Sequence, residues 1–345
     1  MLPEATVRHI DLAIRQHRSF ALALMPGNEL PLWFENGTCR ELSPDGPLTD
    51  TPYSFEFSPW LGKFSGRGII GRMPVVSEEM DVQLRSTSKE EYLKAVTDVI
   101  CQCRERDGKT VYSRIICDRT VGGGCTGWGE IATRFFSRFP LTFRFMFYTP
   151  GTKGWMGATP ELLLEFDKMT GAFHTVAFAG TRKANGSHQW DAKNIHENRI
   201  VSDYILSKLN EIGIKATASE LSTVNYGSIE HLCSHIEGIT GTGRLSEIID
   251  AINPTPALCG FPKQSAIDDI CRFERHKRHC YGGFVAVNGH NTYNAYVNLR
   301  CVHFDDTKYA IYGGGGIMPE SIPLSEYEET EAKTSFLQTL LGHCG

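Results

Sequence analysis

The spacing of apolar residues along the chain predicts a mixture of strands and helices. Short runs rich in β-branched and aromatic residues, bounded by turn residues, are typical of strands. On this pattern we expect strands at residues 21–24, 32–34, 109–117, 142–148, 162–166, 173–178, 229–236, 282–287, 292–304 and 309–312. The turn dipeptides Asn36-Gly37 and Asn288-Gly289 join neighbouring runs, which favours antiparallel pairing.

Other segments repeat their apolar residues every three or four positions, as one face of a helix requires. Ser88 and Glu91 have the spacing of a capping box, which predicts that a helix starts there. Further helices are expected at residues 128–138, 191–212, 248–252, 267–273 and 326–341. We therefore predict an α/β fold of the α+β type, in which helices cover the outer faces of mostly antiparallel sheets.

Composition and charge limit the classes of molecule that the protein is expected to bind. The chain has 345 residues, 41% of them hydrophobic, and a formal net charge of -5, which argues against nucleic acid or an anionic membrane as partner. The 11 cysteines are scattered and include no Cys-x-x-Cys pair, as in reduced cytosolic proteins. With no signal-peptide pattern and no long apolar segment, we expect a cytoplasmic protein.

The last expected helix carries charge on a face that should be buried. Glu326, Glu329 and Lys333 share one face with Phe336 and Leu340, since they are three or four residues apart. Uncompensated buried charge is costly, so these side chains need a partner. The alternative is that the first turn extends past the core and is solvated.

The helix at 191–212 repeats this pattern, because Glu197 falls on the same stripe as Val201 and Tyr204. An edge carboxylate paired with a Lys or Arg is the simpler interpretation. However, two helices that each turn a carboxylate inward favour a shared cation. Carboxylate oxygens without His or Cys ligands suit Mg²⁺ better than Zn²⁺.

Two glycine-rich stretches are candidates for anion binding. Residues 313–316 are four glycines that follow an expected strand, and bare backbone can approach an anion closely. A flexible turn is the alternative. Residues 122–127 match G-x-G-x-x-G, but no acidic residue ends the next strand, as a dinucleotide site would need. We interpret this second stretch as a loop.

Together, these features resemble the chorismate-utilising enzymes, which include isochorismate synthases, salicylate synthases and the large components of anthranilate and aminodeoxychorismate synthases. The matching stretches occur in family order. They are residues 109–114 (KTVYSR), 157–163 (GATPELL), 179–182 (AGTR), 231–232 (HL), 254–257 (PTPA), 260–262 (GFP), 281–283 (YGG), 298–300 (NLR), 313–317 (GGGGI) and 326–330 (EYEET), with Lys333. The resemblance implies one catalytic domain over residues 1–345, with a shortened, weakly matching part at 1–108 and a motif-bearing core at 109–345.

The resemblance also implies an architecture and a set of roles. It implies two large antiparallel sheets packed face to face, with the active site in a cleft between them. Lys109 matches the general base and Glu161 the general acid. Glu197 and Glu329 match Mg²⁺ ligands, and Glu326 matches a supporting acid. The residues that match substrate-binding groups are Gly180, Thr181, His231, Tyr281, Arg300, Gly314, Gly316 and Lys333.

Two positions depart from the family pattern. Asn198 stands where the family usually has His, and Asn194 stands where several members have an acid. These departures put the outer shell of the metal site in doubt, although both main carboxylates are present.

The expected reaction converts chorismate to isochorismate by adding water at C2 and expelling the C4 hydroxyl. A poor leaving group needs a general acid with a raised pKa, and water needs a general base. Lys109 stands where anthranilate synthases carry Gln, and Ala179 stands where aminodeoxychorismate synthases often carry a nucleophilic Lys. Both favour water as nucleophile, and we expect no glutamine amidotransferase subunit.

Three alternatives remain at this point: a salicylate synthase that goes on to eliminate pyruvate, a non-catalytic chorismate-binding homologue, and, more remotely, a Rossmann oxidoreductase. The sequence does not separate menaquinone from siderophore biosynthesis as the pathway, and it does not give the oligomeric state.

Overall fold

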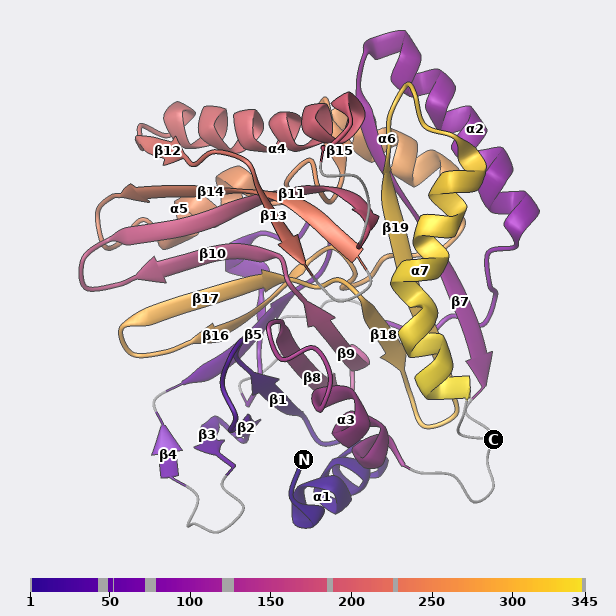
Figure 1. The fold of residues 1–345 in the computed structure, drawn as a ribbon. Coiled ribbons are helices and arrows are strands. Elements are labelled where there is room, and N and C mark those ends of the chain that lie inside the picture. The colour runs from indigo at the N-terminus through magenta and orange to yellow at the C-terminus, as the bar shows by residue number, and fades with distance from the viewer. Residues whose placement is uncertain are drawn as a thin grey trace.

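The computed structural model describes residues 2–42, 49–51, 53–71, 79–119, 127–184, 189–225 and 229–342. Within these residues the chain forms two large sheets of antiparallel strands with helices outside them (Figure 1). The predicted fold class is confirmed. Residues 122–126 of the G-x-G-x-x-G stretch lie outside the described residues.

The first sheet contains ten of the described strands. In spatial order they are β15 (Gly260–Phe261), β7 (Lys109–Arg119), β19 (Lys308–Ile317), β18 (Cys301–Phe304), β9 (Lys153–Thr159), β8 (Phe143–Thr149), β1 (Phe20–Leu24), β2 (Leu32–Glu35), β3 (Thr38–Glu41) and β4 (Thr49–Thr51). The long pairing of β7 with β19 runs from Arg119 opposite Lys308 to Thr110 opposite Ile317.

The second sheet contains nine of the described strands. Along the main path they are β12 (Ala216–Ala218), β14 (Ile229–Ile239), β11 (Ala172–Lys183), β10 (Leu162–Asp167), β17 (Thr292–Val297), β16 (Phe284–Asn288), β5 (Ser54–Ser58) and β6 (Gly68–Ile69), while β13 (Ser222–Asn225) also pairs with β14. Strands from residues 20–69 thus join both sheets.

Helices cover the outer face of each sheet. The first sheet packs on α1 (Glu4–Arg15), α3 (Trp128–Phe136) and α7 (Pro323–Gly342), and the second packs on α4 (Ala192–Glu211) and α5 (Leu245–Ile252). Beside β7 lie α2 (Lys89–Arg106) and α6 (Lys263–Phe273) (Figure 1). A 3-10 turn, η1, spans Phe64–Gly66. No helix among the described residues is long and apolar enough to cross a bilayer.

The core between the sheets is rich in aromatic rings. Phe143 of the first sheet stacks on Tyr296 of the second at 4.4 Å between ring centroids, and Phe147 stacks on Phe57 at 4.7 Å. Burying such a side chain contributes about 1.5–3 kcal/mol, so these contacts hold the sheets together firmly. Residues of β7 and β19 in the first sheet and of β11 in the second line one cleft.

The capping box predicted at Ser88 is present. The Ser88 hydroxyl accepts from the Glu91 amide at 3.1 Å, and the Glu91 carboxylate accepts from the Ser88 amide at 3.0 Å. Two backbone donors of the first turn of α2 are thereby satisfied.

The single strand predicted at residues 292–304 is wrong. The chain leaves the second sheet after β17, turns at Asn298–Arg300, and enters the first sheet as β18. Arg300 has a left-handed φ of 47°, which a continuous strand does not contain. This turn is what places the Arg300 side chain in the cleft.

The glycines at 313–316 were predicted to follow a strand that ends at residue 312. They instead form the second half of β19. They pair with residues 111–114 of β7. On its other side, β19 pairs with β18 only from Tyr309 to Ile311, so the glycines lie beside the cleft. An extended chain of glycines leaves space for functional side chains on both faces of the sheet.

Candidate active site

A cleft of about 820 Å³ lies between the two sheets. Both predicted catalytic residues, Lys109 and Glu161, line it. So do the two main predicted metal ligands and the predicted substrate-binding residues. These are Glu197, Glu329, Gly180, Thr181, His231, Tyr281, Arg300, Gly314, Gly316 and Lys333. The resemblance therefore selected side chains that the fold brings together from distant parts of the chain.

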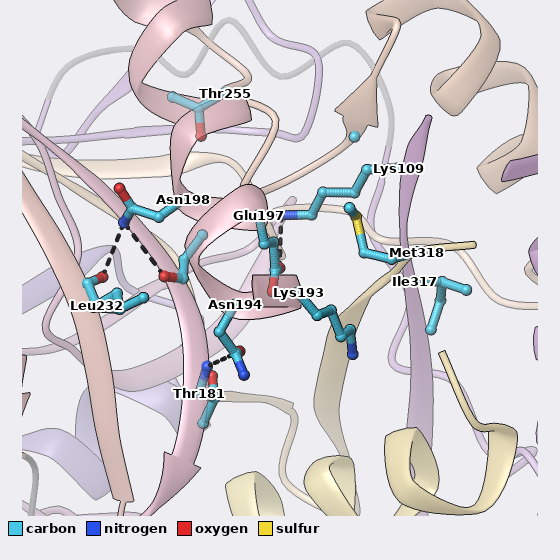
Figure 2. Close-up of polar contacts among 12 residues, drawn as sticks. Lys109, Thr181, Lys193, Asn194, Glu197, Asn198, Leu232, Thr255, Ile317 and Met318 are labelled. Carbon is cyan, nitrogen blue, oxygen red and sulfur yellow. Dashed lines mark hydrogen bonds and ion pairs between the residues drawn. The ribbon is translucent and has the colours of Figure 1, made fainter. Parts of the chain in front are cut away.

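Lys109 and Glu197 form a buried ion pair, with Lys109 Nζ 2.8 Å from Glu197 Oε1 (Figure 2). The Lys109 side chain is only 1% exposed. Burial raises the pKa of Glu197, but the ammonium groups of Lys109, Lys193 and Lys333 together more than offset this effect, and the net pKa lies below the ordinary value. Glu197 is thus held as a carboxylate.

Glu161 lies where the chain passes from β9 to β10, and its side chain is buried. Burial raises its pKa to about 7, although the cations of Lys109, Lys333 and Arg300 act in the opposite direction. A carboxyl group with this pKa is partly protonated near neutral pH. It is therefore able to donate a proton, as the role predicted for Glu161 requires.

The two acidic residues of α7 that were predicted for the metal site each contact a lysine. Glu329 Oε1 lies 2.6 Å from Lys333 Nζ, and Glu326 Oε1 lies 2.7 Å from Lys193 Nζ of α4. Glu326 is 2% exposed and does not line the cleft, so the solvated first turn considered for α7 is excluded at this residue. Burial, together with the nearby Glu329 carboxylate, raises the pKa of Glu326.

The glycine half of β19 makes room for these groups. A Cβ on Gly316 would lie 2.3 Å from Glu197 Oε1 and 2.6 Å from Lys109 Cε. A Cβ on Gly314 would lie 2.7 Å from the Tyr281 hydroxyl. Gly314 also offers its carbonyl, which accepts from Lys333 Nζ at 3.1 Å. Side chains at Gly314 and Gly316 would therefore displace the groups that line the cleft.

On the opposite wall, Arg300, His231 and Thr181 form a chain of contacts. Arg300 Nη2 lies 2.7 Å from His231 Nε2, and His231 Nδ1 lies 3.1 Å from Thr181 Oγ1. Burial, with the Arg300 cation next in importance, lowers the pKa of His231 well below its ordinary value. The neutral ring accepts from Arg300 through Nε2, which leaves Nδ1–H to donate toward Thr181.

Sequence reasoning missed two charged residues of the site. Lys193 precedes Glu197 by four positions on α4, and this helical spacing is the signal that points to it. Arg278 lines the cleft, but its guanidinium is already engaged by Glu274 at 2.6 Å and by the carbonyls of Val111 and Leu258 at 2.8 Å each. Arg278 therefore supports the wall behind Lys109.

The carboxylates fit a hard divalent cation. Glu197 and Glu329 present oxygen ligands to the same cleft from α4 and α7. No three His, Cys, Asp or Glu side chains among the described residues form a complete metal cage. Mg²⁺ commonly binds through one or two carboxylates, its remaining positions being filled by water and an anionic substrate. The donor chemistry of this pair matches that pattern.

This fold, with a cleft that combines several cations with carboxylates and a carboxyl of raised pKa, defines an enzyme site for a small anionic substrate. The sequence model of the family described as "Chorismate binding enzyme" matches residues 74–342. Since this match covers most of the chain, the protein belongs to the chorismate-binding enzymes.

Individual relatives agree with this assignment. Isochorismate synthase EntC of Escherichia coli strain K12 is 28% identical over 249 residues, or 68% of this chain and 62% of EntC. Salicylate synthase of Mycolicibacterium paratuberculosis is 30% identical over 201 residues, or 54% of this chain and 44% of that enzyme. The matches thus span from 44% to 62% of the length of these relatives.

The solved structure of MenF, the menaquinone-specific isochorismate synthase from Escherichia coli, has the same fold. Its TM-score is 0.75 at 16% identity, and the match covers 94% of this chain and 89% of MenF.

Proposed function

We propose that this protein is an isochorismate synthase, an isomerase that converts chorismate to isochorismate with Mg²⁺ as cofactor. The observation that carries the proposal is that a buried lysine and a buried carboxyl line the same cleft. The lysine is Lys109, and the carboxyl is that of Glu161, whose pKa is raised to about 7. A base and an acid are the two groups that adding water and expelling hydroxide require.

In this mechanism the Lys109 ammonium first loses a proton to solvent, and the neutral amine then takes a proton from water as the oxygen bonds to C2 of the ring. The ring double bond shifts, the C4–O bond breaks, and Glu161 gives its proton to the departing hydroxyl, which leaves as water. One water enters and one leaves, so the product is an isomer of the substrate. Arg300, Lys333 and the Tyr281 hydroxyl are the groups of the cleft that suit the two carboxylates of chorismate.

Bound Mg²⁺ would be held by Glu197 and Glu329, with Glu326 behind them, and would neutralise the ring carboxylate next to these acids. Glu161 is not part of this set and acts as the proton donor. The free thiols of the described cysteines fit the expected reducing cytoplasm.

The choice of water as nucleophile is supported by Ala179, which lines the cleft immediately before Gly180 and has only a methyl group. It offers no amine for the covalent adduct of aminodeoxychorismate synthases. Since Lys109 can activate water directly, the reaction needs no ammonia from an amidotransferase subunit.

The test is to incubate the purified protein with chorismate and Mg²⁺, with and without ammonium, and to identify the products by chromatography. We expect isochorismate in both cases. Anthranilate or an aminodeoxychorismate as the main product would contradict the choice of nucleophile. Salicylate that accumulates without an added lyase would change the assignment to salicylate synthase. Unchanged chorismate would favour a non-catalytic chorismate-binding protein.

A further inference from the structure

Asn194 and Asn198 are the two positions at which α4 departs from the family pattern, and both contact the backbone of β11. They are four residues apart, so they lie one turn apart on neighbouring parts of one helix face. Figure 2 shows Asn198 on the opposite side of Glu197 from Lys109. The sequence left open how Asn198 affects the outer shell of the metal site. The structure places the Asn198 side chain outside that shell.

The part of β11 that these asparagines contact is a β-bulge. Phe178 is opposite Cys233 of β14, and the next pair is Thr181 opposite His231. Ala179 and Gly180 therefore face Leu232 alone, and Gly180 has a left-handed φ of 88°. A bulge of this kind disrupts the ladder of backbone hydrogen bonds locally. Gly180 and Thr181 line the cleft at this point.

Asn198 bonds to the carbonyls around the bulge. Its Nδ2 donates toward the carbonyls of Ala177, Ala179 and Leu232 at 3.0, 3.3 and 3.2 Å. Its Oδ1 accepts from the Ser234 hydroxyl at 3.0 Å. The side chain is fully buried, so three carbonyls on one side and a hydroxyl on the other fix the orientation of the amide.

Asn194 contacts the other end of the bulge. Its Oδ1 accepts from the Thr181 backbone N–H at 3.1 Å, and its Nδ2 donates to both carboxylate oxygens of Asp191 at 2.9 Å. Asp191 is the N-cap of α4 and accepts from the Asn194 backbone N–H at 2.8 Å. The side-chain amide oxygen of Asn194, Oδ1, is thus held against the Thr181 N–H by the N-cap residue Asp191.

We propose that Asn194 and Asn198 are positioning residues that hold the bulge at residues 179–180 and the adjoining Thr181 against α4, and so fix this wall of the cleft relative to Glu197. The two side chains replace hydrogen bonds that the bulge interrupts. Glu197 lies between Asn194 and Asn198 on α4. The position of Gly180 and Thr181 relative to the buried Glu197 carboxylate is therefore fixed. The role in turnover rests on the proposed isochorismate synthase function, but the hydrogen bonds do not.

The first test is made without substrate, by hydrogen–deuterium exchange of the peptide that contains the bulge. Asn194→Ala removes the acceptor of the Thr181 N–H. The double variant Asp191→Asn/Asn194→Asp keeps that acceptor oxygen and also keeps a donor–acceptor pair between residues 191 and 194. We expect exchange at the bulge to be at least tenfold faster in Asn194→Ala and close to wild type in the double variant. Asn210→Ala, an exposed asparagine on the same helix, is the matched control. An unchanged exchange rate in Asn194→Ala would overturn the proposal.

The second test measures turnover of chorismate by the same variants. Asn194→Ala should lower kcat/KM at least tenfold with a melting temperature within a few degrees of wild type, and Asp191→Asn/Asn194→Asp should restore kcat/KM to within threefold. Asn198→Asp, which turns an oxygen toward three carbonyls, should lower kcat/KM further. Faster exchange with unchanged kcat/KM would limit the asparagines to a structural role and overturn the positioning claim. If wild type does not convert chorismate, the proposed function fails, and the exchange experiment still decides whether the bulge is held as described.

Discussion

Replacing Glu161 by Gln tests the raised pKa of the predicted general acid through stability as well as activity. The pKa of this buried carboxyl is about 7 in the folded protein and 4.5 in an ordinary setting. The protonated form is therefore favoured by folding. The stabilisation that protonation gives is fully present below pH 4.5 and is lost as the pH rises through about 7.

The shift from 4.5 to about 7 corresponds to roughly 3 kcal/mol, since one pKa unit is about 1.4 kcal/mol. Gln has nearly the same shape and does not ionise. Relative to wild type, Glu161→Gln should gain about this amount of stability between pH 4.5 and pH 8. At the entropy of unfolding typical for a chain of 345 residues, the change is about 4 °C in melting temperature.

The assay is a series of thermal and urea unfolding curves of both proteins from pH 4 to pH 8, with the exposed Glu105→Gln on α2 as control. In parallel, kcat/KM of wild type for chorismate should fall above pH 7, where the acid is ionised, and Glu161→Gln should lose at least ~10²-fold in kcat. Stability curves of wild type and Glu161→Gln that run parallel across this pH range would refute the raised pKa. A Gln variant with near-normal turnover would remove Glu161 from the mechanism.

The remaining predictions concern the other groups of the cleft. Lys109→Ala should lower kcat at least ~10²-fold and destabilise the protein by about 3 kcal/mol, because it leaves Glu197 buried and unpaired. Adding Glu197→Gln to this variant should recover part of that stability. An unchanged free energy of unfolding in Lys109→Ala would contradict the buried pair. Gly316→Ala places a Cβ 2.3 Å from Glu197 Oε1 and should abolish turnover, whereas Gly315→Ala meets nothing closer than 3.5 Å and should retain a fold close to wild type; equal activity of the two would refute the packing argument. Treatment with EDTA should abolish turnover and added Mg²⁺ should restore it, and full turnover in chelator would refute the metal requirement.

Periodicity alone located the buried acids of this site. The helical spacing of Glu197 with Val201, and of Glu326 and Glu329 with Leu340, marks carboxylates on faces that must pack inward, and the structure buries Glu197 and Glu326. The spacing could not identify their partners. Lys109 contacts Glu197 because β7 meets α4 in three dimensions, and Lys193 contacts Glu326 because α4 meets α7. The family resemblance, and not periodicity, supplied Lys109, Glu161 and the rest of the cleft.

The two errors in the predicted strands have one physical origin. Apolar alternation runs unbroken through residues 292–304, so it hides the turn at Arg300 at which the chain changes sheets. Glycine is common in turns, so the stretch 313–316 suggested the end of a strand, although β7 supplies a full partner for it. In both places the deciding factor is a contact with a distant part of the chain, and both places belong to the active site.

The arrangement of charges explains how a cleft with so many acids remains folded. Glu197 contacts Lys109, Glu329 contacts Lys333 and Glu326 contacts Lys193, so each carboxylate has its own ammonium group. Removing one partner of a buried pair costs several kcal/mol, whereas the intact pair is close to neutral in its effect on stability. Pairing therefore allows these acids to be buried without an uncompensated charge. Among the described residues Glu161 forms no ion pair of this kind, and burial raises its pKa to about 7 despite three nearby cations. The same cleft thus contains one carboxyl whose pKa is lowered, that of Glu197, and one whose pKa is raised, that of Glu161. The proposed reaction needs that difference, because its poor leaving group requires a proton donor.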